Sequence, residues 1–201
     1  MQAEVAAIVV AAGESRRMGV PKMALPWGSR TVIGQVIHVL QEAELTEIIV
    51  VTGGAETEVK QALQLQTVCT VRNEQYASGE MLSSVQRGLI GAMEGSAQAA
   101  MIVLGDQPQV QLKVVLGLLQ RWKEAGSRIL IPSYQMRRGH PWLIGRSLWQ
   151  EVLDLQPPST LRSFLETRRE SIDYLNVQTD SILSDLDTPA DYEHQRPVED
   201  G

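Results

Sequence analysis

Short apolar segments rich in β-branched residues alternate with helical hydrophobic stripes along the first two-thirds of the chain. The segments 5–11 and 48–51 are apolar on both faces, which is typical of strands buried inside a parallel sheet. Between them, apolar residues recur at the spacing of one helix face: Ile33, Val36, Ile37 and Leu40. The pattern predicts a βαβ unit at the start of the chain.

The alternation continues as far as residue 131. Strands are predicted over residues 67–71, 99–104 and 129–131, and Pro132 is expected to stop the last of them. Two helical stripes lie between these strands: Leu82, Val85 and Leu89, and then Val114, Val115, Leu118, Leu119 and Trp122.

Beyond Ser133 the pattern is irregular. We expect a polar loop over 135–139, helical stretches near 147–155 and 161–168, and short strand-like pieces around 172–177. This part is interpreted as an elaboration of one domain spanning residues 1–194, followed by a polar tail, 195–201, that is expected to fray.

The predicted architecture is a three-layer α/β/α, Rossmann-like fold with a mostly parallel sheet. A chain of 201 residues with 43% hydrophobic content can bury one sizeable core. Ligands of such folds bind at the carboxyl ends of the strands, so functional motifs are expected directly after each strand.

Charge and hydropathy exclude several classes of partner. The formal net charge is −6 and no block of Lys or Arg is present, which argues against a nucleic-acid partner. No apolar run approaches the ~20 residues that span a bilayer, and the N-terminus has no basic leader, so we expect no membrane association and a cytoplasmic location. Cys69 lies in an apolar run and is expected to be a buried structural thiol.

A glycine-bounded segment with three cations follows the first predicted strand: Ala11-Ala12-Gly13-Glu14-Ser15-Arg16-Arg17-Met18-Gly19-Val20-Pro21-Lys22. Gly13 and Gly19 permit close approach of backbone to a ligand, and exposed N–H groups together with Arg16 and Lys22 suit a triphosphate. The segment has neither the ending of a Walker loop nor the dinucleotide glycine pattern, which disfavours ATPase and NAD-binding functions. The alternative is a solvated loop whose arginines bind nothing.

One carboxylate directly follows the predicted strand 99–104. Asp106 is expected at the end of that strand, facing the ligand crevice. Because Mg²⁺ is usually held by one or two carboxylates plus substrate phosphates, Asp106 is the candidate first metal ligand. The alternative is an aspartate that caps a turn or helix.

A second acidic cluster lies near the end of the chain. Asp185 and Asp187 lie on the same side of any strand they occupy. Pro189 suits the first turn of a helix that Asp187 or Thr188 caps.

Several motifs, in chain order, resemble those of the MobA-like nucleotidyltransferases, and within them the molybdenum cofactor cytidylyltransferases. They are the segment 11–22 quoted above, Asn73 with Ser78-Gly79-Glu80-Met81-x-Ser83-Ser84, Gly105-Asp106-Gln107-Pro108, Arg138-Gly139-His140-Pro141 and Asp185-x-Asp187-Thr188-Pro189. The first motif is specific at superfamily level, and the third and fourth narrow the resemblance towards the molybdenum-cofactor branch.

The resemblance implies a fold of the nucleotide-diphospho-sugar transferase type and a role for each matching residue. Around the nucleotide it places Ala11, Ala12, Gly13, Ser15, Asn73, Gly79 and Ser83, with Arg16 and Lys22 on the phosphates. It places Asp106 and Asp187 on Mg²⁺, with Asp185 as the alternative second ligand. Arg138 and His140 would face the acceptor; a structural hydrogen-bonding role is the alternative for His140.

The implied reaction joins CTP and molybdopterin to give a cytosine dinucleotide form of the cofactor and pyrophosphate. CTP is favoured over GTP because Ala12 stands where guanylyl-transferring relatives usually carry glycine. The alternatives are a guanylyltransferase, a sugar-phosphate nucleotidyltransferase, and a non-catalytic factor that delivers molybdenum cofactor to a molybdenum hydroxylase.

Overall fold

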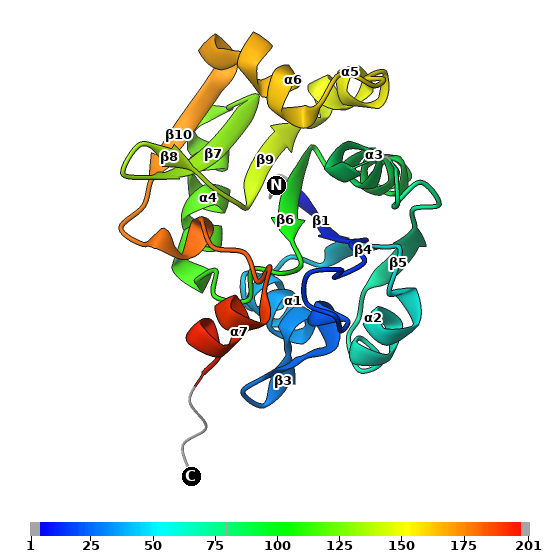
Figure 1. Cartoon of the computed structure of the whole chain (residues 1–201). Coiled ribbons are helices and arrows are strands. Elements are labelled where there is room, and N and C mark those ends of the chain that lie inside the picture. The colour runs from blue at the N-terminus through cyan, green and yellow to red at the C-terminus, as the bar shows by residue number, and fades with distance from the viewer. Residues whose placement is uncertain (1–4, 79, 198–201) are drawn as a thin grey trace.

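The computed structural model describes residues 5–78 and 80–197, and a twisted sheet lies at its centre (Figure 1). The strands are β1 (Val5–Ala11), β2 (Pro26–Trp27), β3 (Arg30–Thr31), β4 (Glu47–Thr52), β5 (Cys69–Arg72), β6 (Ala99–Leu104), β7 (Ile129–Tyr134), β8 (Arg137–Arg138), β9 (Trp142–Gly145) and β10 (Ile172–Asn176). The α-helices are α1 (Val32–Glu42), α2 (Glu56–Ala62), α3 (Glu80–Met93), α4 (Leu112–Ala125), α5 (Trp149–Leu153), α6 (Leu161–Thr167) and α7 (Pro189–Gln195). Short 3₁₀ helices are η1 (Lys22–Ala24), η2 (Arg146–Leu148), η3 (Arg169–Ser171) and η4 (Asp180–Ile182).

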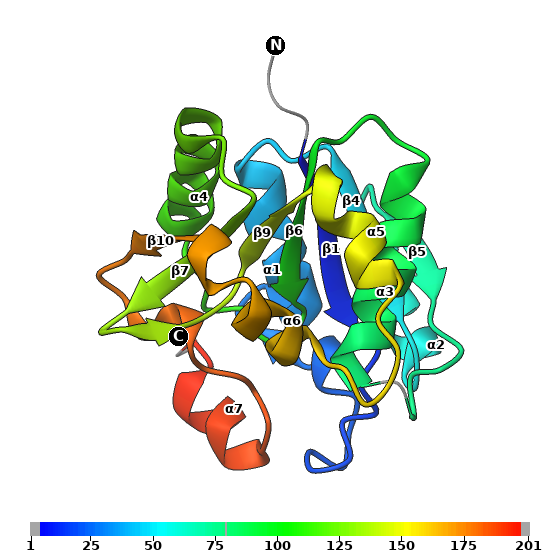
Figure 2. The same ribbon diagram turned by 90° about the horizontal axis from the view of Figure 1, so that it is seen from above.

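The main sheet has the strand order β10-β7-β9-β6-β1-β4-β5, with β8 paired to β7. The pairs β1–β4, β1–β6, β4–β5 and β7–β10 are parallel, whereas β9 runs antiparallel to both β6 and β7. Helices cover both faces of this sheet (Figure 2), so the predicted three-layer, mostly parallel α/β fold is confirmed.

Alternate side chains of β1 enter two separate cores. Ala7 and Val9 pack in the core under α1 and α4, whereas Ala6 and Ile8 pack in the core under α3, α5 and α6. A strand buried on both faces must be apolar at every position, which explains the unbroken apolar run in the sequence.

Local sequence signals set the ends of several helices. The Thr31 hydroxyl accepts a hydrogen bond from Gly34 N at 3.1 Å and caps the start of α1. At the end of α4, Gly126 takes a left-handed conformation with φ of 58°. Thr160 forms a capping box with Ser163 at the start of α6.

Two predictions about the region from Pro132 to Gly145 are wrong, and one strand there was not predicted. Strand β7 continues through Pro132 to Tyr134, because Pro132 and Ser133 still pair with Leu175 and Asn176 of β10. The expected loop 135–139 contains β8, which pairs with β7 through a tight turn whose two residues, Gln135 and Met136, both have positive φ. The apolar strand β9 was not predicted.

The remaining predictions concern Cys69 at the sheet edge, the C-terminal tail and membrane-spanning helices. Cys69 is exposed rather than buried, and it lies at the start of the edge strand β5. The predicted tail begins at Gln195, the last residue of α7, and residues 198–201 lie outside the described part of the chain. Within the described residues, no helix has the length and apolar character needed to cross a bilayer.

The strand order reverses beside β1. The chain runs from β1 to β4 and β5 on one side and then returns to form β6 on the other. Val10 pairs with Leu104, so the segments that follow β1 and β6 leave the sheet side by side. The carboxyl ends of these two strands therefore form the crevice where ligands of such folds bind.

Two glycines of α3 test how closely this helix packs on the sheet. A Cβ at Gly88 would lie 2.2 Å from Ile8 Cγ2, whereas a Cβ at Gly91 would make only ordinary contacts, the nearest at 3.5 Å. We expect Gly88→Ala to lower the free energy of unfolding by about 1–3 kcal/mol through overpacking. Gly91→Ala is expected to raise it by up to about 1 kcal/mol, because alanine favours the helix. Urea unfolding of both variants measures the difference, and equal effects would contradict this packing.

Candidate active site

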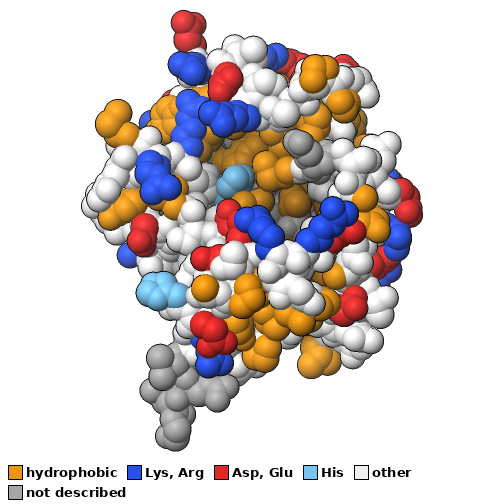
Figure 3. Space-filling model, in the orientation of Figure 1, with side chains coloured by type: hydrophobic (Ala, Val, Ile, Leu, Met, Phe, Trp, Pro, Cys, Tyr) orange, Lys and Arg blue, Asp and Glu red, His pale blue; other side chains and the backbone are white. Residues whose placement is uncertain are grey.

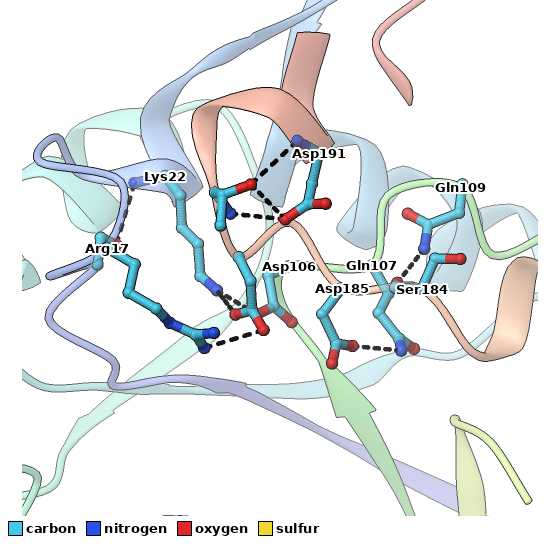
Figure 4. Close-up of polar contacts among 11 residues, drawn as sticks. Arg17, Lys22, Asp106, Gln107, Gln109, Ser184, Asp185 and Asp191 are labelled. Atoms are coloured by element: carbon cyan, nitrogen blue, oxygen red, sulfur yellow. Dashed lines mark hydrogen bonds and ion pairs between the residues drawn. The ribbon is translucent and has the colours of Figure 1, made fainter. Parts of the chain in front are cut away.

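Three segments that are distant in the sequence meet at the ends of β1 and β6. Gly105 N donates to Val10 O at 3.0 Å, which ties the turn after β6 to the end of β1. Leu186 N donates to Asp106 O at 3.2 Å and brings the segment before α7 to the same place. Figure 4 shows side chains from all three segments facing one another.

Lys22 links the two acidic motifs. Its Nζ lies 2.5 Å from Asp106 Oδ2 and 3.4 Å from Asp187 Oδ1. The Lys22 and Asp106 side chains are only 10% and 16% exposed, so this ion pair is largely shielded from water. The structure thus brings together Asp106, predicted as the first metal ligand, and Asp187, predicted as the second.

The loop before Lys22 is closed by hydrogen bonds to Ser15. The Ser15 hydroxyl accepts from Lys22 N at 3.1 Å, and the Ser15 carbonyl accepts from Met18 N and Gly19 N at 3.0 and 3.1 Å. Positive φ angles of 54° at Ser15 and 70° at Gly19 allow this tight path. Ser15, predicted to contact nucleotide, therefore also fixes the backbone from which the Lys22 side chain projects.

The two arginines of the loop have different partners. Arg17 Nη2 lies 2.9 Å from Asp187 Oδ2, on the opposite oxygen from Lys22. Arg16, which was predicted to hold phosphate, pairs with Glu14 at 2.6 Å, and its side chain is 77% exposed. Sequence reasoning singled out Arg16 and passed over Arg17, because adjacent residues in a loop are indistinguishable by pattern alone.

Helix α7 positions Asp187. Thr188 caps this helix in a capping box with Asp191, so of the two predicted caps Thr188 is the one observed. The Tyr192 hydroxyl donates to Pro26 O at 2.6 Å, and its ring packs against Trp27 in the β2–β3 hairpin. The hairpin that follows the cationic loop thereby holds the helix that follows Asp187.

Asp185 lies beside the pair but has a different partner. Gln107 Nε2 donates to Asp185 Oδ1 at 2.8 Å, and Gln107 itself is buried. Partial burial, followed by the negative charge of Asp106, raises the pKa of Asp185, and the hydrogen bond from Gln107 acts in the opposite direction. Gln107 therefore joins the two acidic motifs. The sequence alone did not indicate this role.

The donor set fits a divalent cation that is shared with a substrate. Asp106 and Asp187 already converge on one positive charge, the Lys22 ammonium. Among the described residues, no group of three or more His, Cys, Asp or Glu side chains has the arrangement of a complete metal site. Two carboxylates with the remaining positions left to phosphate and water is the way in which Mg²⁺ is commonly bound.

The segment Ala11 to Gly13 borders this cluster with its backbone. The Ala12 carbonyl accepts a hydrogen bond from Gly54 N at 3.1 Å, and a Cβ at Gly53 would lie 2.4 Å from that same oxygen. A Cβ at Gly13 would meet no atom within 4 Å, so Gly13 faces open space. The backbone at Gly13 is therefore accessible to a ligand, whereas the Ala12 carbonyl is used within the protein.

Asn73 serves to anchor the start of α3. Its Nδ2 donates to the hydroxyls of Ser83 and Ser84 at 2.9 and 3.0 Å, and its Oδ1 accepts from Gln75 N at 2.9 Å. The structure thus unites Asn73 and Ser83, two residues predicted in the nucleotide pocket, whereas Gly79, the third, lies outside the described residues.

The predicted acceptor residues lie on the β7–β9 side of the molecule. The Arg138 guanidinium stacks over the Tyr174 ring at 5.3 Å from its centroid. His140 N donates to Ile182 O at 3.0 Å, and its ring atom Nε2 is shielded from solvent with no hydrogen-bond partner among the described residues. Figure 3 shows a hollow in this face, with apolar side chains at its floor and charged side chains along its lower edge.

Comparisons with known proteins define the class. The MobA-like NTP transferase domain matches residues 7–172, and the chain belongs to this family of nucleotidyltransferases. It is 28% identical over 188 residues to the molybdenum cofactor cytidylyltransferase of Escherichia coli K12, and 27% identical over 191 residues to the nicotine blue oxidoreductase of Paenarthrobacter nicotinovorans, with 92% of each chain covered in both comparisons.

Solved structures agree with this class. The crystal structure of Rv0371c from Mycobacterium tuberculosis has a TM-score of 0.80 and 28% identity, covering 96% of this chain and 98% of that one. The same mycobacterial protein in complex with manganese has a TM-score of 0.76 and 27% identity, with 95% and 97% covered. The family match ends at residue 172, before Asp187. The candidate role of Asp187 as a metal ligand therefore depends on its position beside Lys22 in the structure.

The partly buried His140, whose Nε2 is shielded from solvent, predicts a pH dependence of stability. Burial lowers the pKa of His140 from 6.5 to about 4, so the folded protein binds fewer protons than the unfolded chain between these values. Folding stability should therefore fall as the pH falls from 6.5 to 4, by at most about 3 kcal/mol from this residue. Urea unfolding of wild type and His140→Gln at pH 7 and pH ~4.5 checks this; parallel losses in both proteins would contradict it.

Proposed function

We propose that this protein is a Mg²⁺-dependent CTP:molybdopterin cytidylyltransferase. The observation that carries the proposal is the Lys22 ammonium shared by Asp106 and Asp187 at the β1–β6 crevice of a MobA-like fold. The similarity to the Escherichia coli cytidylyltransferase over 92% of both chains supports the acceptor and the nucleotide. The manganese complex of the mycobacterial relative supports a divalent cation, which we propose to be Mg²⁺ here.

In the proposed reaction the terminal phosphate of molybdopterin attacks the α-phosphorus of CTP. A phosphorus–oxygen bond forms to the acceptor, the bond between the α-phosphorus and the bridging oxygen breaks, and pyrophosphate leaves. The acceptor phosphate has its second pKa near ~6, so it is largely anionic at neutral pH and needs no strong base. A catalytic histidine is not required by this chemistry.

The residues of the site supply positive charge and alignment. Bound Mg²⁺ would be held by Asp106 and Asp187 and would neutralise charge on phosphate oxygens. Lys22 and Arg17 stabilise the negative charge that moves onto the leaving pyrophosphate, with a smaller contribution from Arg16. The exposed backbone at Gly13 contacts the nucleotide, and Arg138 and His140 face the acceptor.

Nucleotide choice is proposed to depend on Ala12. Its side chain is buried and packs towards Gly53, where a Cβ would lie 2.9 Å from Ala12 Cβ. We propose that this methyl group acts on base choice through its contact with the Gly53 backbone and favours the smaller cytosine over guanine. The dinucleotide product would then pass to a molybdenum hydroxylase.

Loss of Asp106 should lower turnover strongly without unfolding the protein. Removing one group that stabilises transferred charge costs on the order of 2.7–4 kcal/mol, so Asp106→Asn and Lys22→Ala should each lose about 100-fold or more in rate. The assay mixes protein, Mg²⁺, reduced molybdenum cofactor and each nucleoside triphosphate in turn, and follows release of pyrophosphate. Asp154→Asn, which makes the same change of charge at the end of α5, is the matched control.

Each result of this assay has a distinct meaning. Acceptor-dependent release with CTP that is lost in Asp106→Asn supports the proposal. Release of pyrophosphate with GTP alone would make the protein a guanylyltransferase. Release with a sugar phosphate as acceptor would make it a sugar-phosphate nucleotidyltransferase. Binding of cofactor without any pyrophosphate release contradicts catalysis and favours a delivery factor.

The two loop arginines should differ in their contribution. Arg17 contacts Asp187 beside Lys22, whereas Arg16 pairs with Glu14 away from the carboxylate pair. We expect Arg17→Ala to lower kcat/KM for CTP by about 100-fold, as for loss of one charge-stabilising group, and Arg16→Ala to lower it much less. Steady-state kinetics of the two variants measures this difference in kcat/KM. A larger loss in Arg16→Ala than in Arg17→Ala would contradict it and would support Arg16 as the phosphate-binding arginine.

A further inference from the structure

Lys22 occupies the place between the two candidate metal ligands. Its ammonium nitrogen is 2.5 Å from Asp106 Oδ2 and 3.4 Å from Asp187 Oδ1. A Mg²⁺ ion would need the same oxygens at ~2.0–2.1 Å in near-octahedral geometry. A cation bound to both carboxylates would therefore overlap the ammonium group and be repelled by its charge.

We propose that Lys22 is the resident cation of the nucleotide-free site and that it yields the carboxylates to a divalent metal only when a triphosphate arrives. Binding of metal and binding of triphosphate are thereby coupled through one side chain. This inference rests on the proposed function, because it takes Asp106 and Asp187 as the metal ligands.

The structure separates the fixed part of Lys22 from the part that can move. Its backbone N–H is bound by the Ser15 hydroxyl at 3.1 Å, and its carbonyl accepts from Leu25 N at 3.2 Å. Beyond this anchored backbone the ammonium is carried on a flexible four-carbon stem. The charge can therefore be transferred from one anion to another without a change in the loop.

Arg17 keeps Asp187 ready for this exchange. It contacts Oδ2 of Asp187 at 2.9 Å, whereas Lys22 approaches Oδ1. When the ammonium leaves, Asp187 still has a cationic partner on Oδ2, and its Oδ1 becomes available to a metal ion. A triphosphate supplies the new anionic partner that draws the ammonium away, since phosphate oxygens form strong charge-assisted hydrogen bonds with lysine.

The coupling has a consequence for each ligand. Without nucleotide, a divalent cation must displace Lys22 and leave a largely buried ammonium without its anion, so metal binding is weak. With nucleotide bound, the same carboxylates are free to bind the divalent cation. Bound triphosphate thus raises the affinity for the metal. By thermodynamic reciprocity, bound metal raises the affinity for triphosphate by the same factor.

Mn²⁺ titration without nucleotide tests the proposal, with electron paramagnetic resonance measuring the free ion. Lys22→Met removes the charge and retains the length of the side chain, so it should tighten Mn²⁺ binding on the order of 10-fold or more, within the roughly 5- to 150-fold range of coupled sites. Lys22→Arg retains a cation and should bind Mn²⁺ as weakly as wild type. Should the methionine variant fail to fold, Lys22→Gln carries the same expectation.

Two controls separate this inference from the function on which it rests. Lys123→Met removes an exposed charge in the last turn of α4 and should leave Mn²⁺ affinity unchanged. The double variant Lys22→Met with Asp106→Asn should lose the gained affinity. Equal Mn²⁺ affinity in folded Lys22→Met and wild type overturns the resident-cation role alone. Absence of Mn²⁺ binding in every protein, with CTP present as well, removes the Asp106–Asp187 metal site and the inference with it.

Discussion

The ion pair of Lys22 with Asp106 and Asp187 is the interaction on which the site depends, because it joins three distant segments of the chain. Each of the three residues is positioned by a different segment. Lys22 lies on the loop that is closed by Ser15, Asp106 follows β6, and Asp187 precedes α7. Like charges at Asp106 and Asp187 would repel one another without a cation between them. The fold thus assembles two carboxylates at the strand-order reversal, and a lysine compensates for their charge.

The sequence predicts the regular part of the fold well, and the reason is physical. Strands such as β1 and β6 are buried on both faces, so their apolar runs are unmistakable, and α1 and α4 show stripes of one face. The antiparallel strand β9 was missed because an apolar run of four residues after a proline is too short to distinguish from a loop. The sequence favours a stop at Pro132 because it does not reveal that Pro132 pairs with Leu175 of β10.

The site was predictable in kind and not in detail. The resemblance placed Asp106 and Asp187 on one metal and Lys22 on the nucleotide phosphates, and the structure brings these three side chains together. Which loop arginine joins them depends on backbone turns at Ser15 and Gly19, and no periodicity encodes those turns. The anchoring contact from Gln107 was hidden for the same reason, because its partner Asp185 lies far away in the sequence.

A crystal structure of the protein with Mn²⁺ and a non-hydrolysable CTP analogue is the most direct measurement of the central claim. The account predicts an anomalous manganese peak within about 2.5 Å of carboxylate oxygens of both Asp106 and Asp187, close to the ligand distances of hard cations. It also predicts the Lys22 ammonium on a phosphate oxygen. A manganese ion bound elsewhere, or a Lys22 side chain still seated on Asp106 with nucleotide and metal present, would contradict it.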